Sequence, residues 1–152
     1  ELWIKNINPK KKNSRLYIFG INNYNHHINK KNLNKYNIFF FGRVSKDQLR
    51  SIYNKSSAMI CLGYDETFCL NALEANACGL PILTFGKTSL KNYAINNLNS
   101  YVLKNYHELS DKILLLSNSK INKKIIFDSL KFSKRYLLKS VKNQWIDLFN
   151  SL

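Results

Sequence analysis

Short apolar runs and helical patterns alternate along most of the chain. Helical spacing is present at Leu49, Ile52 and Tyr53, and again over residues 109–116. Four apolar runs have the length and composition of buried strands: residues 16–20, 38–41, 57–62 and 81–85. A strand, a loop, a helix and a second strand in that order form a βαβ unit, whose strands pair in parallel. The pattern therefore predicts an α/β fold with a parallel sheet.

The segment between the third and fourth runs carries the signals that start and stop a helix. Thr67 is placed to cap its N-terminus, and Glu66 brings a negative charge to the positive end of the helix dipole. Gly79 and Pro81 end it, since glycine is favoured just past a helix end and proline cannot continue a helix. The spacing of three and four residues predicts an inward-facing stripe at Leu70, Leu73 and Ala77.

Two glutamates mark this predicted helix. Glu74 follows Thr67 by about two helical turns, so its side chain returns to the side on which the helix opens. A negative ligand there would meet free N–H groups of Phe68, Cys69 and Leu70. The spacing favours a nucleotide sugar, with the diphosphate at the helix end, one carboxylate on sugar hydroxyls and the other on a ribose diol. Alternatively, Glu66 only complements the dipole and Glu74 is an exposed helix residue.

A second place for a ligand follows the second apolar run. Ligands of open parallel sheets bind beyond the C-terminal ends of the strands, which is where Gly42, Arg43 and Val44 are expected. We expect these residues to line a nucleotide base, although Arg43 is equally compatible with a solvated surface charge. Ser45 and Gln48 then form a capping-box pattern at the start of a helix.

The C-terminal part is predicted to be helical. From residue 121 onward apolar residues keep helical spacing with lysines between them, and a break near Phe132 and Ser133 predicts two helices. The stripe consists of Ile125, Leu130, Leu137, Val141, Trp145, Leu148 and Leu152. We expect this stripe to pack in the core.

The composition is that of a basic globular domain. The 152 residues suffice for one domain, and 45% of them are hydrophobic. Lys and Arg number 24 against 9 Asp and Glu, which gives a net charge of +15. Such an excess suits an anionic membrane surface, nucleic acid or an acidic ligand, but Lys, Asn, Ile and Tyr are enriched together, as in A+T-rich genomes. No nucleic-acid-binding motif is present, so we expect no nucleic-acid partner.

The cysteines and histidines give no metal-binding pattern. Cys61, Cys69 and Cys78 are odd in number and lack C-x-x-C spacing, which argues against a zinc site or a disulfide framework and favours a reducing, cytoplasmic location. No histidine accompanies Cys69, so we interpret it as a small residue in a crowded loop and not as a nucleophile. Adjacent His26 and His27 point in different directions, and we expect no metal.

The order of motifs resembles a known enzyme family. The motifs are E-T-F-C-L at 66–70, L-E-A at 73–75 and A-C-G-L-P-I at 77–82, with F-F-F-G-R-V at 39–44 and L-N-S-Y-V-L at 98–103. They resemble the E-x7-E region and flanking motifs of retaining glycosyltransferases of the GT-B fold, most closely glycosyltransferase family 4. The similarity covers most of residues 16–103.

The resemblance implies a Rossmann-like, doubly wound parallel sheet that forms the donor-binding, C-terminal half of a GT-B enzyme. Residues 119–152 would be its C-terminal helical extension, and the N-terminal acceptor domain and the first strand of this domain would lie outside residues 1–152. The implied reaction transfers a sugar, with retention, from a nucleotide diphosphate sugar to an acceptor hydroxyl, in bacterial-type glycan or glycolipid synthesis. The implied partners are the nucleotide sugar, a glycan or lipid-linked acceptor and the chain's own N-terminal domain, without a cofactor. An anionic membrane surface, at the inner face of the membrane, is a further partner that the resemblance leaves open.

The resemblance also implies roles for individual residues. Glu66 would be the catalytic residue that holds sugar hydroxyls, and Glu74 would bind ribose. The backbone of Thr67 and of the residues up to Leu70 would face phosphate or sugar oxygens. In relatives the loop at Gly86 and Lys87 approaches the sugar phosphate, so both are expected substrate-binding residues.

The chain departs from the family pattern at several positions. Cys69 stands in place of a glycine that lets phosphate approach the backbone, which is expected to narrow the site. Asn76 replaces a common methionine and is expected to be harmless, whereas Asn92 and Ser100 replace a glutamate and a glycine. The family's basic pair R-x4-K has no equivalent near the start of the chain, and Lys87 is the candidate to compensate in part.

Other classes of function remain open at this level. A shared fold is compatible with a non-catalytic nucleotide-sugar-binding module, or with an epimerase or phosphorylase relative of GT-B fold. A basic nucleic-acid-binding domain is a more distant alternative.

Overall fold

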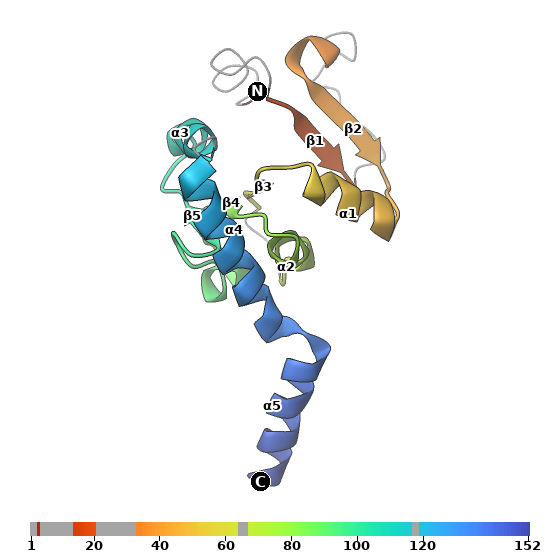
Figure 1. Cartoon of the computed structure of the whole chain (residues 1–152), viewed down its shortest axis with the longest axis vertical. Helices are drawn as coiled ribbons and strands as arrows, with labels where there is room; N and C mark the ends of the chain where they lie inside the picture. Colours follow the sequence, from red (N-terminus) through yellow and green to blue (C-terminus); the bar gives the residue numbers. More distant parts are fainter. Residues whose placement is uncertain (1–2, 4–13, 21–32, 64–66, 117–118) are drawn as a thin grey trace. The chain divides into compact units, whose positions relative to one another are not determined.

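The chain divides into two compact units, Glu1–Lys55 and Ser56–Leu152. The structure, a computed structural model, describes residues 3, 14–20, 33–63, 67–116 and 119–152 (Figure 1). Trp3 is the one described residue before position 14, and His26 and His27 lie outside the described part.

The first unit contains a parallel pair of strands and one helix. Strand β1 (Leu16–Phe19) pairs with β2 (Ile38–Gly42), with Leu16 opposite Ile38, and the 3-10 turn η3 (Asn34–Tyr36) precedes β2. Helix α1 (Lys46–Asn54) follows. Its predicted capping box is confirmed, because Gln48 N–H donates to Ser45 Oγ at 3.3 Å and Ser45 N–H donates to Gln48 Oε1 at 2.8 Å.

The second unit contains the predicted βαβ arrangement. Strands β3 (Met59–Cys61), β4 (Ile82–Thr84) and β5 (Ser100–Val102) form a parallel sheet in the order β3-β4-β5 (Figure 1). Helix α2 (Leu70–Ala77) joins β3 to β4. The 3-10 helix η4 (Thr88–Asn92) lies between β4 and β5, and α3 (His107–Leu115) follows β5. The α/β fold with parallel sheets is thus confirmed.

The start and the inner face of α2 differ from the sequence prediction. The N-cap residue is Cys69, not Thr67, and Leu70 is 63% exposed instead of buried. Ala77 is also exposed. The buried residues are Cys69, Ala72, Leu73, Ala75 and Asn76. The predicted stripe is confirmed at Leu73 and wrong at Leu70 and Ala77, because 69, 72, 73 and 76 are the positions that share the buried helical face.

The C-terminal end of α2 is closed by backbone hydrogen bonds. Leu80 N–H donates to the Ala75 carbonyl and Gly79 N–H to the Asn76 carbonyl, both at 2.9 Å, which is the Schellman pattern. Gly79 has φ +81°, and a Cβ at this position would lie 3.0 Å from Ile126 Cγ2. The predicted glycine stop is confirmed. Glycine is required there both by the backbone conformation and by the close approach of helix α4 (Ser119–Ser133).

Asn76 is the centre of a buried polar network. It is 0% exposed, and its Nδ2 donates to the carbonyls of Leu80 at 2.7 Å and Asn99 at 3.1 Å. Asn99 Nδ2 donates in turn to Asn76 Oδ1 and to the Tyr93 carbonyl, both at 2.9 Å. The amide of Asn76 thus joins the end of α2 to the segment before β5, and the expectation that Asn76 is a harmless replacement stays a prediction.

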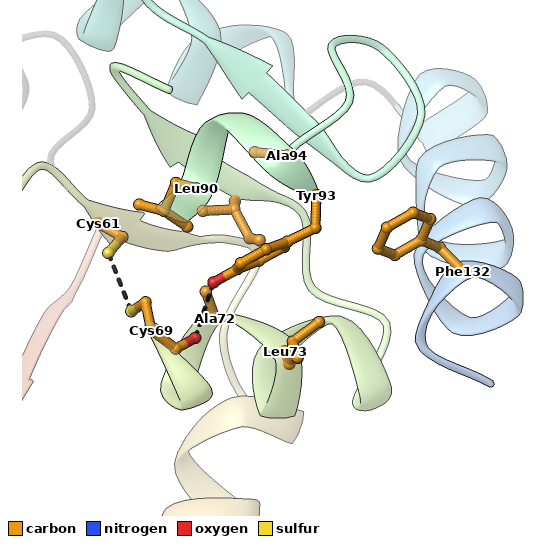
Figure 2. Packing of buried hydrophobic residues seen from close by; sticks show 9 residues of the cluster. Cys61, Cys69, Ala72, Leu73, Leu90, Tyr93, Ala94 and Phe132 are labelled. Carbon is orange, nitrogen blue, oxygen red and sulfur yellow. Dashed lines mark hydrogen bonds between the residues drawn. The ribbon is translucent and has the colours of Figure 1, made fainter. Parts of the chain in front are cut away.

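Buried side chains of α2 and η4 pack together with a side chain of helix α4. Figure 2 shows Tyr93 above Leu73 of α2, with Phe132 to the right. The cluster comprises Cys61, Cys69, Ala72, Leu73, Ile82, Leu90, Tyr93, Ala94 and Phe132.

In β5, burial raises the pKa of Tyr101 above its ordinary value of 10.0.

The C-terminal stripe divides at the predicted break. Helix α4 (Ser119–Ser133) is followed by the 3-10 turn η5 (Lys134–Tyr136) and by α5 (Leu138–Asn150). In α4 the stripe residue Ile125 is buried, as expected, whereas Leu130 is 38% exposed and Phe132, at the predicted break, is buried. In α5 the stripe is exposed, with Trp145 at 55%, so the expectation of core packing was wrong for this helix. Among the described helices, none combines the length and the apolar character needed to cross a bilayer.

Candidate functional site

The candidate site is the N-terminal end of α2, at the edge of the sheet where β3 and β4 end. The parallel strands β3 and β4 finish at Cys61 and Thr84, so the connection into α2 and the loop after β4 leave the same sheet edge. Open parallel sheets bind their ligands beyond this edge.

The first turn of α2 is partly closed by its own backbone. Leu70 N–H donates to the Phe68 carbonyl at 2.8 Å, and Ala72 N–H donates to the Cys69 carbonyl at 3.0 Å. The Cys69 side chain makes no capping hydrogen bond. The prediction that the Leu70 N–H group is free was therefore wrong. The positive end of the helix dipole is what this turn still offers to an anion. Thr67 is exposed before the helix and does not cap it.

Tyr93 fixes the backbone at the helix start. Its hydroxyl donates to the Cys69 carbonyl at 2.9 Å, a bond drawn as a dashed line in Figure 2. The Phe68 ring lies 5.6 Å from the Tyr93 ring, and Phe68 itself is exposed. Sequence reasoning missed Tyr93, because a tyrosine after a short turn carries no signal that it will reach a helix 24 residues away in sequence.

Glu74 lies on the exposed side of α2. It follows the first helical residue, Leu70, by one turn, about 6 Å along the axis. Because α2 begins at Leu70 and not at Thr67, Glu74 is one turn from the helix start instead of the two turns predicted. Its carboxylate shares the exposed side with Leu70 and Asn71.

Glu66 lies outside the described residues, so the expected convergence of its carboxylate with that of Glu74 stays a prediction. The described site consists of the start of α2, the exposed Glu74 and the loop after β4.

The loop after β4 contributes a tight turn and a cation. Gly86 has φ +61°, and a Cβ there would lie 3.0 Å from Val102 Cγ1. Its N–H donates to Thr84 Oγ1 at 3.1 Å, and Lys87 is exposed. The turn thus sets Lys87 at the edge at which β4 ends, where an ammonium group suits an anionic ligand.

The predicted base-lining residues belong to the first unit. Gly42 ends β2 with φ +62°, and its carbonyl accepts from Gly20 N–H at 2.7 Å. Arg43 is exposed and Val44 is half-buried. They lie at the C-terminal end of β2, as predicted, while their role toward a base stays a prediction.

None of the three cysteines forms a disulfide bond. Cys61 and Cys69 are buried, with their Sγ atoms 3.3 Å apart, whereas Cys78 is half-buried. Within the described ranges, no group of three or more His, Cys, Asp or Glu residues is arranged to hold a metal ion.

The family model described as "Glycosyl transferases group 1" matches residues 2–128 of this chain. An uncharacterized glycosyltransferase of Methanocaldococcus jannaschii is 29% identical over 102 residues, which are 65% of this chain and 29% of that protein. The chain therefore spans less than a third of this curated relative.

Solved glycosyltransferases have the same fold. A mutant of TarM from S. aureus, solved with UDP, fondaparinux and α-GlcNAc-glycerol, superposes with a TM-score of 0.76 at 19% identity, over 97% of this chain and 31% of that chain. The C-terminal domain of the group 1 protein LpcC from Francisella tularensis gives a TM-score of 0.60 at 22% identity, over 72% of this chain and 60% of that chain. These likenesses identify the Rossmann-like architecture of a GT-B C-terminal domain.

Proposed function

Because the chain belongs to the group 1 glycosyl transferases, we propose that it is the donor-binding half of a retaining glycosyltransferase resembling family 4. The reaction transfers a sugar, of hexose type, from a nucleotide diphosphate sugar to an acceptor hydroxyl. Catalysis consists mainly of positioning the donor and stabilising the departing diphosphate.

The observation that carries this proposal is the position of Glu74. Its carboxylate is exposed one turn from the start of α2, at the sheet edge where ligands of parallel sheets bind. A carboxylate there can accept two hydrogen bonds from a ribose diol while the diphosphate lies toward the positive end of the helix. Lys87, exposed beyond β4, supplies positive charge for the phosphates.

The remaining roles follow from the family. Glu66 holds the hydroxyls of the donor sugar, and the backbone from Thr67 to Leu70 borders the sugar phosphate. Gly42, Arg43 and Val44 border the nucleotide base. The acceptor, a glycan or a lipid-linked sugar, binds chiefly to an N-terminal domain. Support comes from the fact that this chain spans about three tenths of the length of the Methanocaldococcus jannaschii relative and of TarM. We place the reaction in the cytoplasm, with an anionic membrane surface as a candidate partner.

The proposal is tested by titrating the protein with UDP, GDP and ADP, because the base is not known. Glu74→Gln is expected to weaken the preferred nucleotide at least about tenfold, since a charge-assisted hydrogen bond is worth about 1.5–3 kcal/mol. Asp111→Asn, which removes one exposed helical carboxylate elsewhere, is the matched control and is expected to leave affinity unchanged. Equal affinity of the Glu74→Gln variant and the unmodified chain would contradict the ribose-binding role.

Glu66→Gln separates sugar recognition from nucleotide recognition. This variant is expected to bind the nucleotide diphosphate normally but to bind the matching nucleotide sugar several-fold more weakly. If it weakens both ligands equally, Glu66 does not act on the sugar.

A further inference from the structure

The second unit places two thiols together at the candidate site. Cys61 is the last residue of β3 and Cys69 is the N-cap of α2, and their Sγ atoms are 3.3 Å apart (Figure 2). Both are buried, at 8% and 5% exposure. We propose that Cys61 and Cys69 are an oxidisable pair that forms an intramolecular disulfide when the protein meets a peroxide.

The geometry requires little movement. One thiol donates a hydrogen bond to the other sulfur at 3.3 Å, so the two sulfurs already face each other. A disulfide of about 2.05 Å requires an approach of roughly 1.2 Å, within the range of small side-chain rotations. The pair is eight residues apart, and the bond would tie the end of β3 to the start of α2.

The environment of Cys69 favours it as the first thiol to react. Cys69 lies at the helix N-terminus, where the backbone dipole stabilises negative charge. Cys61 then acts as the resolving thiol, held at contact distance.

The chemistry balances with hydrogen peroxide as the oxidant. The Cys69 thiolate attacks one peroxide oxygen, the O–O bond breaks, and the released hydroxide takes up a proton to form water, which leaves a sulfenic acid. The Cys61 sulfur then attacks the Cys69 sulfur, the S–O bond breaks, and a second water leaves with the Cys61 proton. Two thiols and one peroxide thus give one disulfide and two waters.

Peptide mapping identifies the bridge directly, because the sequence separates the cysteines. Cleavage after Lys55, Glu66, Glu74 and Lys87 places each cysteine in its own peptide: 56–66, 67–74 and 75–87. After treatment with stoichiometric peroxide, the intact chain is expected to be about 2 Da lighter, with peptides 56–66 and 67–74 joined and Cys78 free. Dithiothreitol is expected to restore three thiols.

Three cysteine variants test which thiols form the bridge. Cys78→Ala is the matched control and is expected to form the bridge as the unmodified chain does, whereas Cys61→Ala and Cys69→Ala are expected to lose it. Cys78 is the most exposed of the three, so preferential oxidation of Cys78, a bridge that contains it, or a bridge between two chains would overturn the proposal. So would survival of three free thiols.

The disulfide would also regulate the candidate site, a consequence that rests on the proposed function. The bond would tie Cys69, whose carbonyl Tyr93 holds, to Cys61 and so restrict the start of α2. The oxidised chain is expected to bind its preferred nucleotide, chosen from UDP, GDP and ADP, at least about fivefold more weakly. A mapped bridge with unchanged affinity would overturn the regulatory role alone. A mapped bridge with no nucleotide binding in either redox state would instead overturn the proposed function.

Discussion

The two ends of helix α2 are held in different ways. At the C-terminal end, Gly79 closes the backbone and Asn76 binds two carbonyls in a fully buried network. At the N-terminal end, the Cys69 side chain makes no capping bond, and Phe68 and Leu70 are exposed. The hydroxyl of Tyr93 reaches this end through the Cys69 carbonyl.

We interpret the difference as that between a structural end and the end at which the proposed donor binds. Buried, fully bonded groups at the C-terminus fix the helix against the sheet and α4, so that the other end can remain open to a ligand. Substitutions at the C-terminal end should therefore lower stability, whereas substitutions at the N-terminal end should act mainly on nucleotide affinity.

The largest expected effect is that of Asn76→Ala. Removal of this amide leaves the Leu80 carbonyl without its side-chain donor, and it takes one of two partners from the Asn99 carbonyl and one of two acceptors from the Asn99 amide. We expect the free energy of unfolding to fall by about 2–4 kcal/mol, as measured by urea denaturation. In a double-mutant cycle with Asn99→Ala the two costs should not add, because the residues share their bonds. Full additivity would show that the network does not act as a unit.

Gly79→Ala is expected to cost less. The new Cβ must accept φ +81° and lie 3.0 Å from Ile126 Cγ2, for a total of about 1–3 kcal/mol. Gly20→Ala is a matched control, since Gly20 has φ +84° but a Cβ added there would meet nothing within 4 Å. If thermal denaturation shows equal costs for the two variants, the approach of α4 to the end of α2 is not tight.

Tyr93→Phe is expected to have the smallest effect on stability and to act on binding. The change removes the hydrogen bond to the Cys69 carbonyl, at a cost of about 1 kcal/mol, and keeps the ring in contact with Phe68. Nucleotide affinity should fall several-fold in a calorimetric titration, as the start of α2 loses its anchor. A loss of stability without any change in affinity would place Tyr93 with the structural end.

The sequence predicted the elements whose signals are local. The capping box at Ser45, the glycine stop at Gly79 and the break near Ser133 each depend on a few neighbouring residues, and each is confirmed. The strand pairing followed from the βαβ order and is confirmed as parallel.

The errors arose where a distant partner decides the outcome. Asn76 is buried because Asn99 and Leu80 accept its protons, and a polar residue in a helix gives no sign of such partners. Cys69, not Thr67, is the N-cap, and its side chain is buried beside Cys61, a contact that the local capping signal does not reveal. The apolar stripe of α5 likewise keeps the helical spacing that predicted burial, yet it is exposed. Helical spacing alone does not show what a stripe packs against.

The most direct test of the central claim is an amide chemical-shift titration of the labelled protein with UDP, GDP and ADP. The account predicts that one of these nucleotides shifts the signals at the start of α2, from Phe68 to Asn71, together with Glu74 and Lys87, and leaves those from Asn76 to Leu80 nearly unchanged. Shifts concentrated at the C-terminal end of α2, or no shifts with any of the three nucleotides, would contradict it.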